Sequence, residues 1–396
     1  MNNIQDEFGD HAVELDLLRQ RAFNLRWAEQ PADVIPLTAA DPDFPCAQVI
    51  RDAVCDYAKS GVFSYGPAEG LPSFRGAAAT MLQQRKGMPT ASAEHVLAVN
   101  SAAKGMAIVA QSLLAPGDEA LVFDPVDFLF ARTVQDAGGV PVRVPLDPES
   151  GALDFARIES AITRRTKLLT ICNPVNPVGR VLTRTELLRL GELAIEHDLA
   201  ILSDEIWSDI VFAPHRHIAT AALSPEIAAR TYTVHGLSKT FGLAGLRIGF
   251  VHVGNQARYE AMVEQANVRS TVEGVATLSQ VAATAAYEHG WPWADAWVAH
   301  LHRQRDVAVA ELRKVSGLSL REPEGCYVLF PEVKAWGDES VLAQRLLDQH
   351  RIAIVPGAPR WFGAGAAGHI RLTFATSESI LREGLARLCR GLDALR

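Results

Sequence analysis

Lys239 lies in the segment of the sequence best suited to chemistry, Thr231-Tyr-Thr-Val-His-Gly-Leu-Ser-Lys-Thr-Phe-Gly-Leu-Ala-Gly-Leu-Arg-Ile-Gly-Phe250. A β-branched run precedes this lysine, small residues surround it, and an arginine follows eight positions later. We therefore expect its amine at a loop between two buried strands, partly removed from water. Desolvation lowers the pKa of a lysine and allows the amine to act as a nucleophile. Such an environment is the one that a Schiff-base lysine needs.

Three other polar segments follow predicted strands. Asn173-Pro-Val-Asn-Pro-Val-Gly179 comes after an apolar run, and its two prolines stiffen the loop that carries Asn176. Asp204 is a carboxylate at the end of the next apolar run. Ser101-Ala-Ala-Lys-Gly105 opens a predicted helix, and the free N–H groups of a helix start can hold an anion. We expect these segments to outline one pocket.

The elements that must position these groups alternate between short apolar runs and helical patterns, which predicts a parallel sheet covered on both faces. In such sheets ligands bind beyond the carboxyl ends of the strands. The pattern changes near residue 291, which predicts a large domain of residues 46–290 and a small domain of residues 1–45 and 291–396. Expected strands are 95–99, 120–123, 140–144, 167–172, 200–203, 231–234 and 247–253, and expected helices include 101–114, 184–197, 293–315 and 377–395.

A lysine, a strand-end carboxylate, a strand-end amide and a helix N-terminus are together the groups that pyridoxal phosphate requires. The lysine forms an imine with the cofactor, and the carboxylate keeps the pyridine nitrogen protonated. The helix N-terminus and a nearby arginine neutralise the phosphate. The sequence therefore predicts an enzyme that uses pyridoxal 5'-phosphate.

The combined signature of residues 173–179, Asp204-Glu-x-Trp207 and Ser238-Lys-x-x-x-x-x-Gly-x-Arg247 resembles that of the fold-type I pyridoxal phosphate enzymes, in the class I/II aminotransferase family. The resemblance covers nearly the whole chain. It implies an α/β protein with the aspartate aminotransferase fold. That fold has a mostly parallel seven-stranded sheet with helices on both faces, plus a smaller α/β domain.

The resemblance also implies roles for individual residues around the cofactor. Lys239 would form the imine, Asp204 would face the pyridine nitrogen and Asn176 would bind the ring hydroxyl. The phosphate would lie in the turn formed by Ala102, Ala103 and Lys104, with Ser238 and Arg247 completing its site.

Other positions would bind the substrate or complete the site from a second subunit. Arg371, in Gly368-His-Ile-Arg-Leu-Thr-Phe374, matches the arginine that binds the α-carboxylate, and Ala40 replaces a glycine whose backbone lies near that carboxylate. Tyr65 matches a tyrosine that reaches the phosphate of the neighbouring subunit. A homodimer with shared active sites is therefore implied.

Two positions depart from the family pattern. Trp207 stands where aminotransferases carry tyrosine and the related lyases histidine, so only an indole N–H remains to contact the cofactor. Asp127 stands where an aromatic ring stacks on the cofactor, although Phe128 could supply that ring after a shift of one residue. If Asp127 points into the site, it could bind a basic or hydroxylated substrate. We expect the loops near Asp127, Arg269 and residues 360–362 to shape the substrate pocket.

Within the family, the chain looks closest to the carbon–sulfur β-lyase branch related to cystathionine β-lyase. Ala40-Asp-Pro-Asp-Phe-Pro45, Ser203-Asp-Glu-Ile-Trp-Ser-Asp209 and Arg371-Leu-Thr-Phe-Ala-Thr376 carry this likeness, whereas Glu324-Gly-Cys-Tyr-Val-Leu-Phe330 reads more like an aminotransferase. We therefore expect β-elimination at a carbon–sulfur bond of a cysteine thioether, slightly ahead of amino transfer to a 2-oxo acid. Decarboxylation with deamination and β/γ-replacement stay open as specialised reactions.

Composition narrows the remaining function classes. A formal net charge of -8 gives no basic footprint for nucleic acid, and no apolar run is long enough for a membrane span. The start of the sequence lacks a signal-peptide pattern, so we expect a cytoplasmic enzyme with small-molecule amino-acid substrates. The five scattered cysteines predict neither disulfides nor a metal site. A cofactor-binding regulator without catalysis is the alternative from another class.

Overall fold

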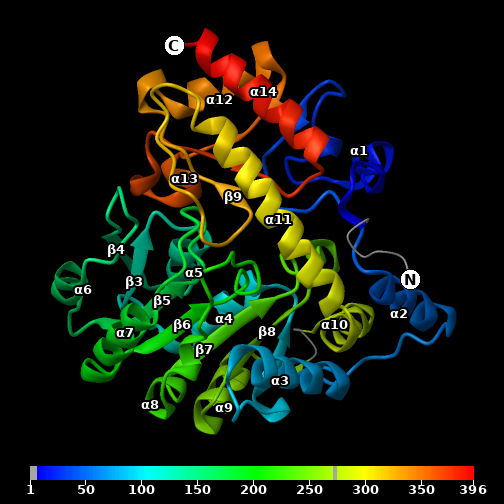
Figure 1. The fold of residues 1–396 in the computed structure, drawn as a ribbon. Coiled ribbons are helices and arrows are strands. Elements are labelled where there is room, and N and C mark those ends of the chain that lie inside the picture. Colours follow the sequence, from blue (N-terminus) through cyan, green and yellow to red (C-terminus); the bar gives the residue numbers. More distant parts are fainter. Residues whose placement is uncertain (1–6, 271–273) are drawn as a thin grey trace.

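Seven strands form the central sheet of this computed structural model, which describes residues 7–270 and 274–396 (Figure 1). The strand order is β2-β8-β7-β6-β5-β3-β4, and neighbouring strands are parallel except for the two pairs that involve β8. The mostly parallel sheet expected from the sequence is thus confirmed. Its strands are β2 (Val96–Val99), β3 (Glu119–Asp124), β4 (Val140–Pro145), β5 (Thr166–Cys172), β6 (Ala200–Asp204), β7 (Thr231–Gly236) and β8 (Gly249–Val253).

Helices cover both faces of this sheet, which explains why its inner strands are buried along their whole length. Val109, Phe130 and Met262 belong to the apolar cluster on one face, and Leu187 and Ile227 belong to the cluster on the other. The first face carries α4 (Ala102–Leu113), α5 (Leu129–Asp136) and α9 (Gln256–Gln265), and the second carries α6 (Phe155–Ala161), α7 (Arg184–Glu196) and α8 (Pro225–Ala228).

Two smaller sheets lie outside the large one, and the first of them joins the two ends of the chain. A two-stranded parallel sheet pairs Ile35 with Ile352, and a three-stranded antiparallel sheet has the order β11-β12-β9. The division of the chain into residues 46–290 and the two flanking segments stays a prediction. The strands are β1 (Ile35–Pro36), β9 (Val328–Leu329), β10 (Ile352–Ala353), β11 (Val355–Pro356) and β12 (Ile370–Thr373).

The remaining helices pack beside these sheets. In Figure 1, α11 runs from α10 near the large sheet up to α14 and α12 at the other end of the molecule. The apolar side chains of α3, α10, α11 and α14 belong to one large cluster. These helices are α1 (Leu15–Arg21), α2 (Gln48–Lys59), α3 (Pro72–Lys86), α10 (Thr277–His289), α11 (Trp291–Leu312), α12 (Glu339–His350), α13 (Pro359–Phe362) and α14 (Glu378–Ala394).

Arg247 was expected to begin a strand, but in the structure it lies before that strand. The predicted strand 247–253 begins two residues later, at Gly249, because Arg247 has a left-handed backbone with φ 50° after a short 3-10 turn (Ala244–Leu246). A left-handed residue cannot continue a β-strand, so the chain turns here before it enters the sheet. The arginine consequently lies at the edge of the sheet instead of inside it.

The polar segments singled out in the sequence meet at one edge of the large sheet. Asp204 is the last residue of β6, and Lys239 lies three positions beyond the end of β7. Asn176 follows β5 and Asp127 follows β3, both within a few residues of the strand end. Since these strands are parallel, their carboxyl ends lie side by side, which is where ligands bind in such sheets.

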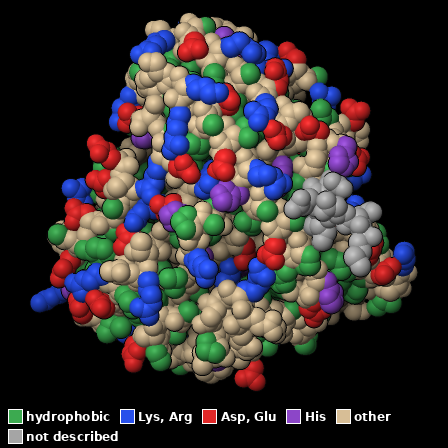
Figure 2. All heavy atoms as spheres, viewed as in Figure 1, with side chains coloured by type: hydrophobic (Ala, Val, Ile, Leu, Met, Phe, Trp, Pro, Cys, Tyr) green, Lys and Arg blue, Asp and Glu red, His purple; other side chains and the backbone are tan. Residues whose placement is uncertain are grey.

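Charges of both signs are interspersed over the face of the molecule drawn in Figure 2. On that face the Lys and Arg side chains are not gathered into a single patch. Among the described residues, no helix combines the length and apolar character that crossing a membrane would require.

Candidate active site

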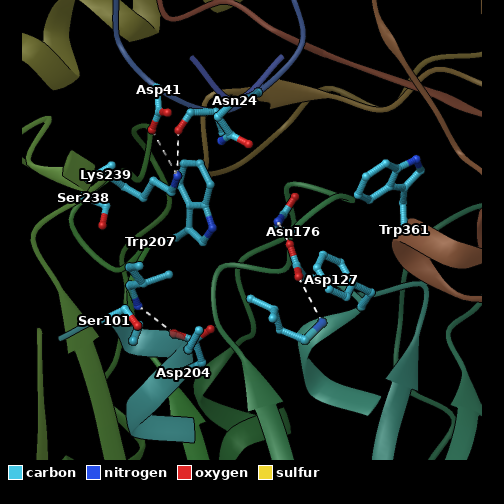
Figure 3. A pocket seen from close by; sticks show the side chains of 18 of the residues that line it. Asn24, Asp41, Ser101, Asp127, Asn176, Asp204, Trp207, Ser238, Lys239 and Trp361 are labelled. Atoms are coloured by element: carbon cyan, nitrogen blue, oxygen red, sulfur yellow. Dashed lines mark hydrogen bonds and ion pairs between the residues drawn. The ribbon is translucent and has the colours of Figure 1, made fainter. Parts of the chain in front are cut away.

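A cavity of about 560 Å³ opens at the carboxyl edge of the large sheet, between that sheet and segments from both ends of the chain (Figure 3). Its volume is within the range of small-molecule sites. All but two of the predicted site residues line it. These residues are Ala40, Ala102, Ala103, Asp127, Phe128, Asn176, Asp204, Trp207, Ser238, Lys239, Arg247 and Arg371.

The amine of Lys239 lies inside this cavity. Its Nζ donates a hydrogen bond to the backbone carbonyl of Ala40 at 2.6 Å and lies 3.8 Å from Oδ1 of Asp41. The amine is also 5.3 Å from the centre of the Trp207 ring. Burial lowers the pKa of Lys239, and the negative charge of Asp41 opposes part of that effect. The amine is thus partly buried with a lowered pKa, the environment that favours a nucleophilic lysine, and its role as the nucleophile stays a prediction.

Asp204 is a buried carboxylate at the bottom of the cavity. Its Oδ1 accepts a hydrogen bond from the backbone N–H of Ile206 at 3.1 Å. Burial raises the pKa of Asp204 to about 7, and the nearby charges of Asp127 and Glu205 add to the shift. No ion pair within the described part of the chain involves this carboxylate. A cation that approached it would be strongly favoured, and a protonated pyridine nitrogen is such a cation.

Arg371, Asn176 and Asp127 form a chain of hydrogen bonds across the cavity. Nη1 of Arg371 donates to Oδ1 of Asn176 at 3.3 Å, and Nδ2 of Asn176 donates to Oδ2 of Asp127 at 3.2 Å. The guanidinium group also donates to the carbonyl of Thr38 at 3.4 Å and lies over the ring of Phe362. Its buried Nε has no hydrogen-bond partner in the described residues. A guanidinium group with long hydrogen bonds and an unused N–H can accept a carboxylate.

The backbone around Asp127 fixes its side chain at the cavity wall. Oδ1 accepts a hydrogen bond from the backbone N–H of Leu129 at 3.1 Å, at the start of α5. The backbone N–H of Asp127 donates to the carbonyl of Asn176 at 3.2 Å. Burial raises the pKa of this carboxyl, whereas the charges of Arg371 and Lys239 lower it. The aspartate expected as a departure from the family pattern therefore does face the site.

Phe128 lines the mouth of the cavity. Its ring packs edge-to-face against Trp361, with the ring centres 6.0 Å apart. Trp361 and Phe362 line the cavity too, as expected for the loop of residues 360–362. Arg269 does not line it, because its guanidinium group is paired with Glu69 and Glu260. Stacking of Phe128 on the cofactor stays a prediction.

The start of α4 faces the cavity on the side of Ser238 and Arg247. Ser101, Ala102 and Ala103 line the cavity there. The side chain of Ser101 caps the helix by accepting a hydrogen bond from the backbone N–H of Lys104 at 3.1 Å. The N–H of Lys104 is therefore already used, and its side chain lines a different, smaller hollow. Ser101 takes the place in the cavity wall that we expected for Lys104.

Tyr65 lies away from the cavity of its own chain. Its side chain is 98% exposed, and the neighbouring Val62 and Phe63 are 62% and 64% exposed. An apolar group of this kind on the surface indicates a contact with another molecule. The predicted role of Tyr65 at the site of a second subunit stays a prediction.

Trp207 packs against Tyr327, with ring centres 4.7 Å apart and the planes 72° to each other. The hydroxyl of Tyr327 donates a hydrogen bond to the carbonyl of Ala40 at 2.8 Å, the same oxygen that Lys239 contacts. Ala40 thus joins the lysine loop to the C-terminal part of the chain.

Sequence reasoning missed the part of the cavity wall formed by Asn24, Leu25 and Glu29. Both Asn24 and Leu25 have left-handed backbones, and their N–H groups donate to the carboxylate of Glu29 at 3.2 and 2.7 Å. No motif in this segment signals a site. Asp41 was also missed, although its place beside Ala40 in the Ala-Asp-Pro-Asp-Phe motif could have indicated it.

Comparison with known proteins agrees with this geometry. The chain belongs to the class I and II aminotransferase family, since the model of that family matches residues 32–388. It is therefore an enzyme whose cofactor is pyridoxal phosphate, as the sequence predicted. The residues of the cavity fit pyridoxal phosphate, because an amine, a buried carboxylate without an ion-pair partner in the described residues and a helix N-terminus face the same space.

Individual relatives match along most of their length. The aspartate/prephenate aminotransferase of Thermus thermophilus is 32% identical over 94% of both chains, and the aspartate aminotransferase of Geobacillus stearothermophilus is 31% identical over 91% of this chain and 92% of the relative. A PLP-bound structure from Clostridium difficile 630, provisionally named an aminotransferase, has a TM-score of 0.87 at 27% identity and covers 94% of this chain and 97% of its own. The expected aspartate aminotransferase fold is confirmed.

These comparisons bear on the choice between reactions. The relatives are named aminotransferases, so the findings favour amino transfer, the reaction that we placed second, over carbon–sulfur β-elimination. They give no specific support to the β-lyase branch that the short motifs of the sequence indicated.

Proposed function

We propose that the protein is an aminotransferase that moves the amino group of an L-amino acid to a 2-oxo acid. The observation that supports this most is the likeness to named aminotransferases along most of the chain, and Lys239, Asp204 and Arg371, which open onto one cavity, supply the groups for the reaction. A nucleophilic amine, a partner for the cofactor ring and a binding group for the α-carboxylate are what amino transfer requires.

Pyridoxal phosphate, when bound, supplies an aldehyde that condenses with amines and a ring that withdraws electrons from the substrate α-carbon. Lys239 supplies the amine for that condensation. The free Nζ of Lys239 would also serve as the base that takes the α-proton and returns a proton. Its lowered pKa favours the neutral amine that both tasks need. Asp204 would stabilise a positive charge on the ring nitrogen.

Other residues of the cavity would hold the α-carboxylate of the substrate and the phosphate of the cofactor. Arg371 binds the substrate α-carboxylate through paired N–H groups, and Asn176 keeps the guanidinium group in place from one side. The start of α4, with Ala102 and Ala103, would hold the phosphate beside Ser238 and Arg247.

The exposed segment around Tyr65 supports a homodimer in which each subunit completes the site of the other. Val62, Phe63 and Tyr65 would be covered by the second subunit, and the Tyr65 hydroxyl would reach the phosphate there. Analytical ultracentrifugation tests the assembly. A monomer at micromolar concentration that retains full activity would overturn this part of the proposal.

The assay that tests the function compares two reactions of the purified holoenzyme. Amino transfer predicts that a 2-oxo acid forms from the amino acid only when an acceptor such as 2-oxoglutarate is added, with glutamate produced in equal amount. The Lys239→Ala variant is the control and should be inactive. Pyruvate, ammonia and free thiol released from a cysteine thioether without any acceptor would instead support β-elimination. Release of carbon dioxide would support one of the specialised reactions.

A further inference from the structure

The cavity is lined by more carboxylates than cationic side chains. Glu29, Asp41, Asp127 and Asp204 line the cavity, and its cationic side chains are Lys239, Arg247 and Arg371. Asp204 is used by the ring nitrogen, and Asp41 lies 3.8 Å from the amine of Lys239. Two carboxylates, those of Asp127 and Glu29, then remain without an assigned partner.

Asp127 is the one closer to the reacting groups. Its two oxygens accept one hydrogen bond each, from Leu129 and from Asn176, so each oxygen can accept another. No ion pair within residues 7–270 and 274–396 involves this carboxylate. Asn176 links it to the guanidinium group of Arg371, which would hold the α-carboxylate, and the charges of Arg371 and Lys239 both act on it. Asp127 therefore lines the same cavity as the α-carboxylate site, one hydrogen-bonded residue away from Arg371, where it can meet the side chain of a bound amino acid.

Glu29 lies in the wall contributed by the N-terminal segment. The backbone N–H groups of Asn24 and Leu25 fix its carboxylate in place. Its greater exposure to solvent weakens its pull on a charge, because water screens such interactions. We therefore assign it the smaller effect.

We propose that the substrate is an L-amino acid with a cationic side chain, which Asp127 binds directly and Glu29 attracts at the cavity wall. This inference rests on the proposed function, because it takes Arg371 to bind the α-carboxylate. A dicarboxylic amino acid would meet Asp127 with a second negative charge, and the three cations of this chain's cavity are already used. Such a substrate is disfavoured by like-charge repulsion.

A binding titration tests the inference without relying on turnover. The α-methyl derivatives of amino acids carry no α-proton to be removed, so the change in cofactor absorbance on adding them to the holoenzyme gives a Kd. We compare α-methylornithine, α-methyllysine, α-methylaspartate and α-methylnorvaline. Norvaline is the neutral match for ornithine, since it lacks only the terminal amine. The two cationic analogues should bind more tightly than both others.

Variants separate charge recognition from a structural role. Asp127→Asn should weaken α-methylornithine about 10- to 100-fold more than α-methylnorvaline, the range expected for hydrogen bonds to a charged group. Glu29→Gln should produce a smaller loss in the same direction. Glu332→Gln, in a separate hollow of the surface, is the matched control and should change neither Kd.

The outcomes are distinct. Equal weakening of both analogues by Asp127→Asn would mean that Asp127 only positions Asn176, and tighter binding of α-methylaspartate in the unmodified enzyme would also overturn the inference. Failure of the proposed function would give a different result. The cationic analogues would still bind selectively, but no natural amino acid would transfer its amino group to an acceptor.

Discussion

Thr240, the residue after Lys239, donates a hydrogen bond of 2.9 Å from its hydroxyl to the carboxylate of Asp209. Asp209 is almost fully buried and forms an ion pair of 2.6 Å with Lys86. Burial alone would raise the pKa of Asp209, but the charge of Lys86 and the hydrogen bond with His235 hold it well below its usual value. The lysine loop is thereby fixed to an ionised group beneath it.

Replacing Thr240 tests this attachment. Thr240→Val keeps the shape of the side chain but leaves the buried carboxylate with one donor fewer, which should lower the free energy of unfolding by about 1–3 kcal/mol. Thr240→Ser keeps the hydroxyl and is the control, with a smaller loss. Denaturant unfolding of the three proteins measures the difference. Equal stability of the two variants would show that the hydrogen bond contributes nothing.

Arg371→Lys should separate substrate binding from cofactor binding. Lysine keeps the charge but lacks the planar pair of N–H groups that matches a carboxylate. We expect kcat/KM for the amino acid to fall by about 10- to 100-fold, the range of one or two hydrogen bonds to a charged group. The affinity for pyridoxal phosphate should stay the same. Arg382→Lys on α14 is the control, and a variant of Arg371 with unchanged kinetics would remove this residue from the substrate site.

The raised pKa of Asp204 predicts a pH-dependent stability of the protein prepared without cofactor. Because the carboxyl of the folded chain keeps its proton up to about pH 7, whereas that of the unfolded chain loses it near pH 4, its contribution to stability falls as the pH rises through that range. Relative to Asp204→Asn, the unmodified protein should lose a few kcal/mol between these pH values. Added pyridoxal phosphate should reduce this loss. A difference between the two proteins that stays constant with pH would contradict the expectation.

Asp41→Asn should shift the titration of Lys239. The carboxylate of Asp41 stabilises the protonated amine, so its removal should lower the pKa of Lys239 further. The pH dependence of the rate at which the protein captures pyridoxal phosphate measures this pKa. The midpoint should move to lower pH in Asp41→Asn and stay in place in Asp393→Asn, a surface control. A midpoint that moves to higher pH would mean that burial of the amine depends on Asp41.

Much of the site could be read from the sequence because its residues follow strands directly. Lys239, Asp204 and Asn176 each lie within a few residues of a buried strand, and a parallel sheet brings all such positions to one edge. Local patterns were enough to place these three. The same patterns put Arg247 inside a strand, since the sequence does not reveal a left-handed backbone at a residue other than glycine.

Other parts of the site depend on contacts between distant segments. Glu29 reaches the cavity because β1 pairs with β10, which brings residues around 30 beside residues around 350. Nothing local to Glu29 indicates that pairing. The role of Tyr65 requires a second chain, and the reaction type depends on differences too small for short motifs to reveal.

The most direct test of the account is to reduce the holoenzyme with borohydride, which fixes an imine as a stable amine, and to locate the modified lysine by mass spectrometry. We predict that the cofactor is found on Lys239 and that Lys239→Ala carries none. Attachment to another lysine, such as Lys104, or no attachment at all, would contradict the account.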